Sequence, residues 1–288
     1  MSARYASPMT VSEATEVLGQ NPGARVLAGG TDLMVQMRLT RNIPELIVDV
    51  KNIAATREIA LSDDGLVLGA AVPAVDLTDH PTLRQVYPGV VEAAELIGSS
   101  QIQSRASLGG NLCHSSPAAD TVPALMAVGA VCRIAGPTGE RRVAVEDFCT
   151  GPGSNVLADG EFLVSFEIPA PGAGSRDAYL RFIPRNEMDI AVVGSGVSVT
   201  VDASGNCTAA RVALGAVAPT AIMVPDAAAA LIGTAIDDGD LERAGAAASA
   251  ASRPITDRRG TAEFRRHVAG VLTRRAAAAA RDRARASL

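Results

Sequence analysis

The sequence has few aromatic residues and lacks the usual signals of a membrane protein or a nucleic-acid-binding protein. It has 288 residues, no tryptophan, 3% aromatic residues and a single lysine, Lys51. Its formal net charge is −5 at pH 7, so the basic footprint of a nucleic-acid-binding domain is absent. No apolar run reaches the roughly 18 residues of a membrane-spanning helix, and the N-terminus does not resemble a signal peptide. We expect a cytoplasmic protein with no transmembrane segment and no nucleic-acid partner. Peripheral attachment at the inner membrane face stays open.

The sequence also lacks the cysteine motifs of metal sites and the commoner nucleotide-binding motifs. The four cysteines are widely spaced, form no C-x-x-C pair and do not cluster with the three histidines. This spacing predicts reduced thiols and no metal or iron–sulfur site in the chain. The sequence contains neither G-x-G-x-x-G nor G-x-x-x-x-G-K-S/T. A Rossmann or P-loop nucleotide site therefore has no support.

Two segments instead place a Gly-Gly pair between apolar residues and a hydroxyl or amide side chain. They are residues 26–33 (VLAGGTDL) and residues 107–112 (SLGGNL). Paired glycines let backbone N–H groups approach a bulky anion such as a diphosphate, because no Cβ stands in the way. Each pair alone is more typical of a tight turn. Together the two segments could hold one dinucleotide from both sides.

Residues 1–53 have the pattern of a small βαβ-like unit. A capping box at Thr10 and Glu13 predicts a helix that runs through Leu18. Residues 25–28 predict a buried strand that leads into the first Gly-Gly pair. Residues 32–39 favour a helix, although the alternation of Leu33, Val35, Met37 and Leu39 is also typical of a strand, and a strand over residues 45–50 completes the unit.

The rest of the chain predicts a mixed middle part, residues 54–174, and an antiparallel third part, residues 175–288. In the middle part we expect a hairpin, short helices and further strands, with Asp120 as the N-cap of a helix over residues 120–128. In the third part we expect three antiparallel strands over residues 178–183, 190–201 and 207–217, followed by helices. The last helix, residues 261–286, is rich in alanine and arginine, which predicts a solvated helix, with a face for docking another subunit as the less favoured alternative.

Four ordered motifs resemble the FAD-binding medium subunit of molybdenum hydroxylases, the family of xanthine dehydrogenase and carbon monoxide dehydrogenase. They are LAGGTDL at 27–33; IG at 97–98 with SLGGN at 107–111 and SPAAD at 116–120; YLR at 179–181 with DIA at 189–191; and SRPITD at 252–257 with FRR at 264–266. The resemblance covers nearly the whole chain. It implies an α+β protein with a two-part FAD-binding fold of the vanillyl-alcohol oxidase (PCMH) type in residues 1–53 and 54–174. A C-terminal domain with a three-stranded antiparallel sheet and helices would follow in residues 175–288.

The resemblance also implies a set of FAD contacts. Backbone N–H groups and the Thr31 hydroxyl of the first motif would wrap the diphosphate, and the second motif would form an opposing loop. Asp120 would accept a hydrogen bond from a sugar hydroxyl, Ile97 would lie near the isoalloxazine ring, and Arg181, with Arg185 as its competitor, would face the flavin pyrimidine. The implied contact residues are Leu27, Ala28, Gly29, Gly30, Thr31, Asp32, Leu33, Ile97, Ser107, Gly109, Gly110, Asn111, Cys113, His114, Asp120, Leu163 and Arg181.

Structural roles remain open for several of these residues: an N-cap for Asp120, a turn residue for Asn111 and strand core for Leu163. Tyr179 could shield the flavin ring or pack in the core.

The function implied by the resemblance is electron transfer. A large molybdopterin subunit would oxidise the substrate, and electrons would pass through [2Fe–2S] clusters of a small subunit to FAD on this chain, in a dimer of heterotrimers. No residue of this chain need be a catalytic acid, base or nucleophile, and we expect no metal ligand in it. Two alternatives remain, a self-contained flavin oxidoreductase and a structural subunit that has lost FAD.

Overall fold

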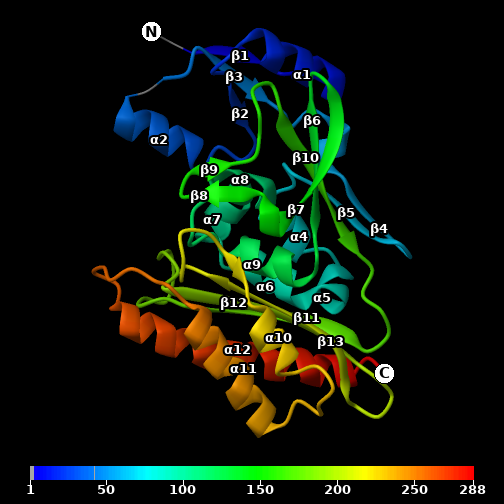
Figure 1. Cartoon of the computed structure of the whole chain (residues 1–288). Coiled ribbons are helices and arrows are strands. Elements are labelled where there is room, and N and C mark those ends of the chain that lie inside the picture. The colour runs from blue at the N-terminus through cyan, green and yellow to red at the C-terminus, as the bar shows by residue number, and fades with distance from the viewer. Residues whose placement is uncertain (1–2, 42) are drawn as a thin grey trace.

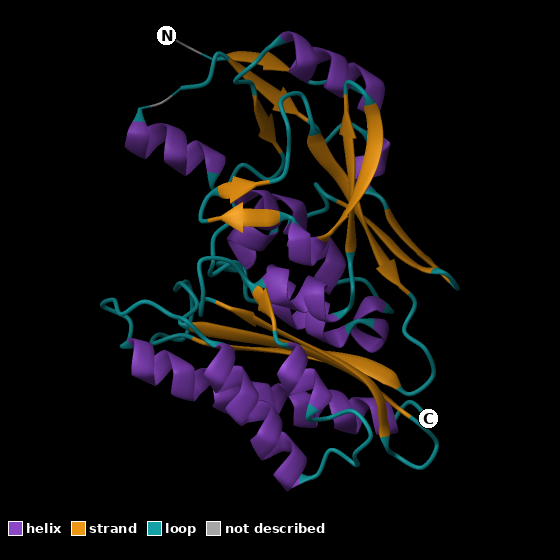
Figure 2. Ribbon diagram, viewed as in Figure 1, coloured by secondary structure: helices purple, strands orange, loops and turns teal. Residues whose placement is uncertain are grey.

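A computed structural model describes residues 3–41 and 43–288 and arranges them in three regions (Figure 1). A three-stranded sheet lies at one end, a five-stranded sheet with short helices in the middle, and a four-stranded sheet at the other end. Buried hydrophobic clusters fill each region. Figure 2 shows helices between the two larger sheets and a second group of helices on the far face of the C-terminal sheet. The boundaries at residues 53 and 174 stay predictions.

The N-terminal region is a parallel sheet with helices between its strands. The predicted strand, helix and strand correspond to β2, α2 and β3, and β1 adds a third strand that was not predicted. The strands pair in the order β1–β3–β2, and both pairings are parallel. The Thr10 hydroxyl accepts a hydrogen bond from the Glu13 N–H at 3.1 Å, which confirms the predicted helix start. The predicted burial of the strand before the Gly-Gly pair was wrong, since Arg25 is exposed at this edge of the sheet. The elements are β1 (Arg4–Ala6), α1 (Val11–Gln20), β2 (Arg25–Leu27), α2 (Leu33–Thr40) and β3 (Leu46–Asp49).

The middle region is built on an antiparallel sheet with strand order β4–β5–β10–β6–β7. The predicted hairpin is confirmed as β4 (Ile59–Ser62) and β5 (Gly65–Gly69). The remaining strands are β6 (Val131–Gly136), β7 (Gly139–Ala144), β8 (Cys149–Gly151), β9 (Ser154–Asn155) and β10 (Phe162–Pro169), and the short 3-10 helix η1 (Val145–Asp147) joins β7 to β8. The helices are α3 (Ala54–Arg57), α4 (Ala74–Thr78), α5 (Leu83–Val86), α6 (Pro88–Glu95), α7 (Ser100–Gln103), α8 (Leu108–His114) and α9 (Thr121–Ala127).

The second Gly-Gly segment differs from its prediction. It is the first turn of α8 rather than a loop, and the Ser107 side chain caps the helix by accepting from the Gly110 N–H at 3.1 Å. Glycine has a low helix propensity, so two adjacent glycines hid this helix in the sequence. Ser107 was the available signal, because serine is a preferred N-cap.

The C-terminal region is an antiparallel meander with helices packed on it. Its strands are β11 (Ser175–Phe182), β12 (Val193–Val201), β13 (Cys207–Gly215) and the two-residue β14 (Ile222–Met223). The three expected strands are confirmed, and β14 adds a fourth. The helices are α10 (Pro225–Ala229), α11 (Asp238–Ala251) and α12 (Ala262–Arg285).

Helix α12 is not the solvated helix that its composition suggested. Its alanines at 269, 276, 277, 280 and 284 are fully buried, and Arg265 is only 4% exposed. The helix packs against β11, β12 and α11, where alanine allows close approach of the backbones. Its arginines at 274, 275, 281, 283 and 285 lie beside that stripe at varied exposure.

One buried carboxylate joins the middle and C-terminal regions. Asp177 of β11 accepts a hydrogen bond at 3.1 Å from the Val90 N–H, which lies in the first turn of α6. Burial raises the pKa of Asp177 to about 7. Arg283 of α12 pairs with Glu92 of α6 and donates to the Asp177 carbonyl at 2.9 Å. The C-terminal sheet therefore caps a helix of the middle region from outside.

No helix in residues 3–41 or 43–288 combines the length and apolar character needed to cross a membrane.

Candidate cofactor-binding site

A cavity of about 700 Å³ lies where the N-terminal and middle regions meet. Three stretches of chain supply most of its lining: the first Gly-Gly segment with the start of α2, the second segment with Ile97, and the turn between β8 and β9 with the start of β10. Val50 and Ala70 complete it from the ends of β3 and β5. The predicted contact residues that line it are Ala28, Gly29, Gly30, Thr31, Asp32, Leu33, Ile97, Ser107, Gly109, Gly110, Asn111, Cys113, His114 and Leu163. The fold therefore brings both glycine motifs to one cavity.

Direct contacts hold the first motif against the residues that flank the second motif. Arg105 Nε donates to the Gly29 carbonyl at 3.4 Å, and His114 Nδ1 lies 3.0 Å from Asp32 Oδ2. A Cβ on Gly29 would lie 2.0 Å from the Arg105 carbonyl oxygen. Gly29 is thus required for close packing of the first motif on the backbone just before the second motif.

The other three glycines have different requirements. Gly30 has a φ of +78°, a conformation that residues with a Cβ rarely adopt. A Cβ on Gly109 would lie 2.4 Å from the Ala70 carbonyl oxygen. A Cβ on Gly110 would meet only Ser107 Oγ, at 3.3 Å, so the backbone there tolerates a side chain. Gly110 is needed only if something else occupies the adjacent cavity.

Backbone donors at the first motif suit an anion. Helix α2 begins with the Met34 N–H donating to the Gly30 carbonyl at 3.2 Å. Within the described part of the chain, no hydrogen bond engages the N–H groups of Thr31, Asp32 and Leu33. Free N–H groups at a helix start favour phosphate binding, both as donors and through the helix dipole.

Asn111 links the cavity to the next helix. Its Oδ1 accepts from Thr121 Oγ1 at 2.7 Å and from the Thr121 N–H at 3.3 Å, at the start of α9. The carbonyl half of the amide is therefore structural, and its N–H groups remain as donors for a ligand in the cavity that Asn111 lines.

Three predicted contact residues lie outside the cavity lining: Leu27, Asp120 and Arg181. Leu27 packs beneath the first motif, since a Cβ on Gly30 would lie 2.9 Å from Leu27 Cδ1. Direct contact of these residues with a cofactor stays a prediction.

Asp120 and Arg181 form a buried cluster with Tyr179. Asp120 Oδ2 accepts from Arg181 Nη1 at 2.8 Å, and Oδ1 accepts from the Tyr179 hydroxyl at 2.9 Å. Burial raises the pKa of Asp120 to about 6, against the opposing effects of Arg181 and Tyr179. Asp120 occupies the N-cap position of α9, but its side chain makes no capping hydrogen bond, so the predicted capping role was wrong. Arg181 Nη1 also donates to the Leu96 carbonyl at 2.9 Å, next to Ile97 at the cavity.

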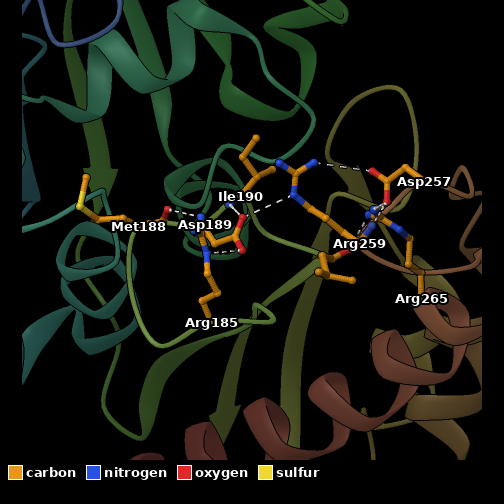
Figure 3. Close-up of polar contacts among 8 residues, drawn as sticks. Arg185, Met188, Asp189, Ile190, Asp257, Arg259 and Arg265 are labelled. Carbon is orange, nitrogen blue, oxygen red and sulfur yellow. Dashed lines mark hydrogen bonds and ion pairs between the residues drawn. The ribbon is translucent and has the colours of Figure 1, made fainter.

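Arg185 belongs to a separate, more exposed network (Figure 3). Its Nε lies 3.1 Å from Asp189 Oδ2, and its side chain is 68% exposed. Arg259 bridges Asp189 and Asp257, and Asp257 also pairs with the buried Arg265 at 2.7 Å. The network ties the loop after β11 to α12 and the segment before it, and none of its residues lines the cavity.

Several cavity residues were missed by sequence reasoning. The turn between β8 and β9 reaches the cavity because Asn155 Nδ2 donates to the Cys113 carbonyl at 3.1 Å. A turn-rich run, GPGSN at 151–155, was the only local signal for it. The missed lining residues are Ala24, Arg25, Val26, Gln36, Val50, Ala70, Ala106, Gly153, Asn155, Leu157 and Phe162.

The cysteine that lines the cavity is protonated at neutral pH. Burial, reinforced by Cys149, raises the pKa of the Cys113 thiol to about 12. All four cysteines are free, and the described residues contain no group of three or more His, Cys, Asp or Glu placed to hold a metal ion.

We expect Cys113 to react with iodoacetamide at pH 8 more than about tenfold slower than in the unfolded chain, because the thiolate is the reactive form. Peptide mass spectrometry of timed samples measures this rate. Equal rates in native and unfolded protein would contradict the assignment.

Fold and cavity together define a class of protein. A small parallel unit and a larger antiparallel sheet border one cavity of about 700 Å³, and its free backbone N–H groups suit a bulky anionic cofactor such as a dinucleotide.

Comparisons with known proteins identify the family. Residues 1–171 match the FAD binding domain in molybdopterin dehydrogenase, and residues 178–280 match the CO dehydrogenase flavoprotein C-terminal domain. The chain is 34% identical over 283 residues to the carbon monoxide dehydrogenase medium chain of Afipia carboxidovorans, covering 98% of this chain and 97% of that one. It is 31% identical over 275 residues to the xanthine dehydrogenase FAD-binding subunit of Escherichia coli O157:H7, covering 95% and 94%.

Solved structures agree. A chain of a Cu,Mo-CO dehydrogenase superposes with a TM-score of 0.93 at 32% identity, covering 98% of this chain and 99% of that one. A chain of quinoline 2-oxidoreductase from Pseudomonas putida 86 superposes with a TM-score of 0.90 at 29% identity, covering 99% of both. The chain belongs to the family of FAD-binding medium subunits of molybdenum hydroxylases. It is an oxidoreductase flavoprotein with FAD as its cofactor, and the predicted fold of an FAD-binding part followed by a C-terminal domain is confirmed.

Proposed function

We propose that this chain is the electron-transfer subunit of a heterotrimeric molybdenum hydroxylase. It takes electrons from [2Fe–2S] clusters of a small partner subunit and passes them through FAD to an external acceptor. A large molybdopterin subunit oxidises the substrate, and two heterotrimers associate as a dimer. The observation that carries the proposal is the single cavity of about 700 Å³ onto which both glycine motifs converge.

The cavity residues fit FAD without a catalytic acid, base or nucleophile. The free N–H groups of Thr31, Asp32 and Leu33 bind the diphosphate, and the Thr31 hydroxyl adds a donor. Gly110 and the Asn111 amide face it from α8. Leu163 and Ile97 supply apolar contacts. When bound, FAD supplies the redox chemistry, and this chain positions it and tunes its surroundings.

The Arg181–Asp120 pair lies next to two segments that line the cavity and holds them in place. Arg181 holds the Leu96 carbonyl and so fixes the adjacent Ile97, while Asp120 directly precedes Thr121, the partner of Asn111. The pair therefore connects two sides of the cavity to the C-terminal sheet. We propose that both residues position the FAD-contacting segments.

Exposed apolar side chains support association with partner subunits. Helix α2 has no buried residue, and Met34, Val35 and Leu39 on it are 43%, 48% and 79% exposed. Figure 1 shows α2 standing away from the rest of the chain. Exposed apolar clusters of this kind mark interaction surfaces. We place the complex in the cytoplasm, with peripheral attachment at the inner membrane face left open.

Purification from the native host without denaturant tests this function. We expect this chain to co-purify with two partner chains, FAD, iron and molybdenum. Complex lacking this chain should still be reduced by the substrate, found from a panel of carbon monoxide, aldehydes and N-heterocycles, but should reduce external acceptors slowly. A chain that oxidises the substrate alone would be a self-contained flavin enzyme, and a complex without FAD would make the chain a structural subunit. Either result would contradict the proposal.

A further inference from the structure

The only lysine of the sequence lies beside the first glycine motif. Lys51 Nζ donates to the Ala28 carbonyl at 3.0 Å and to Asp49 Oδ1 at 2.7 Å, and its side chain is 21% exposed. Ala28 and the neighbouring Val50 both line the cavity. The Lys51 ammonium group therefore contacts the cavity wall from outside, by its hydrogen bond to the backbone of the first motif.

Lys51 is held by a chain of contacts at the carboxyl ends of the three parallel strands. Asp49 ends β3, and its Oδ2 accepts from the hydroxyl of Tyr5 in β1 at 2.6 Å. Burial pushes the pKa of Asp49 upward, but hydrogen bonds from Lys51 and Tyr5 outweigh it, so the pKa is lowered and the carboxylate stays ionised. Ligands of parallel sheets bind beyond this end of the strands. Lys51 is thus anchored where the sheet faces the cavity.

The contact with Ala28 fixes the direction of a backbone donor. In a trans peptide the C=O and the following N–H point in opposite directions within one plane. A lysine that holds the Ala28 carbonyl therefore aims the Gly29 N–H away from Lys51. Arg105 acts in the same way on the next peptide group. It donates to the Gly29 carbonyl and so fixes the direction of the Gly30 N–H. In the described chain these two N–H groups make no hydrogen bond of their own.

We propose that Lys51 is a positioning residue for the diphosphate-binding motif, orienting the Gly29 N–H through the Ala28 carbonyl and contributing a positive charge behind it. This inference rests on the proposed binding of FAD in the cavity. It adds a cation to a site that the sequence presents as one made of neutral donors. Asp49 and Tyr5 keep that cation in place.

Two substitutions separate positioning from folding. In full-length chain depleted of FAD, we expect Lys51→Met to raise the FAD dissociation constant at least about tenfold, while Lys51→Arg, which can still donate to both acceptors, stays within about threefold of wild type. The thermal midpoint of the FAD-free chain should fall in Lys51→Met, because the buried Asp49 carboxylate loses its cationic partner, and should change little in Lys51→Arg. Arg57→Met is the matched control, because it removes one exposed positive charge that pairs with Asp76 outside the cavity lining.

Amine labelling gives a second readout. Since Lys51 is the only lysine of the sequence, an amine-selective reagent such as an N-hydroxysuccinimide ester has one side-chain amine to modify, and peptide mass spectrometry identifies it. Saturating FAD should slow acylation of Lys51 several-fold. Wild-type affinity in Lys51→Met, equal weakening in both Lys51 variants with a lowered thermal midpoint, or acylation unaffected by FAD would overturn the inference. Failure of the wild-type chain to bind FAD would instead contradict the proposed function.

Discussion

Replacing Gly110 with valine is expected to abolish FAD retention while the chain stays folded. Gly110 is exposed at the cavity, and a Cβ there would meet only Ser107 Oγ, at 3.3 Å. The valine side chain therefore extends into the cavity, where we propose that the diphosphate binds, without displacing any backbone. Flavin content per chain and far-ultraviolet circular dichroism measure the two expected outcomes.

Two further glycines provide matched controls. Gly109→Ala should destabilise the fold itself, because its Cβ would lie 2.4 Å from the Ala70 carbonyl oxygen. Gly151→Ala should change neither property, since no atom lies within 4 Å of a Cβ there and the residue is outside the cavity lining. Full flavin content in a folded Gly110→Val chain would show that the second motif does not border the diphosphate.

Replacing Arg181 with methionine is expected to cost about 3–5 kcal/mol of unfolding free energy at pH 8, the usual penalty for leaving a buried charge unpaired. Arg181 and Asp120 are both buried and lie 2.8 Å apart. The variant also loses the donor to the Leu96 carbonyl, so the segment that carries Ile97 is no longer held. Urea titration of the FAD-free chain measures the loss.

The loss should depend on pH. Burial raises the folded pKa of Asp120 to about 6, above its unfolded value, so the folded chain holds a proton that the unfolded chain releases, and stability falls as pH rises through that window. Without Arg181 the pKa of Asp120 in the folded chain rises further, so the pH range over which stability falls extends to higher pH. The cost of Arg181→Met should therefore be smaller at pH 5 than at pH 8. Arg185→Met, at an exposed ion pair, should stay within about 0.5 kcal/mol of wild type. Equal losses in the two variants would contradict the buried-pair account.

Local sequence signals predicted the elements that depend on nearby residues. The start of α1 at Thr10, the hairpin of β4 and β5 and the antiparallel strands of the third part all follow from side-chain spacing and turn residues, although the Glu13 side chain accepts from the Met9 N–H and so does not complete the predicted capping box. The family motifs then predicted which segments would meet at one cavity. Most of the predicted contact residues line it, although their contacts with FAD remain proposals.

Features set by distant contacts were not predictable in this way. The Gly-Gly pair of α8 is helical because Ser107 caps the helix and Gly109 packs on Ala70. Helix propensity describes single residues and includes neither contact. Asp120 has the position of an N-cap, but Arg181 and Tyr179, brought by a strand of another region, take both of its oxygens. The alanines of α12 are buried because a sheet covers them. In each case, tertiary packing overrides the local pattern.

The most direct test of the central claim is the visible spectrum and extracted cofactor content of this chain, purified from its native host without denaturation. The account predicts a flavin spectrum and close to one FAD per chain. A colourless chain that takes up no added FAD would contradict it, because the cavity and its free backbone donors would then hold no dinucleotide.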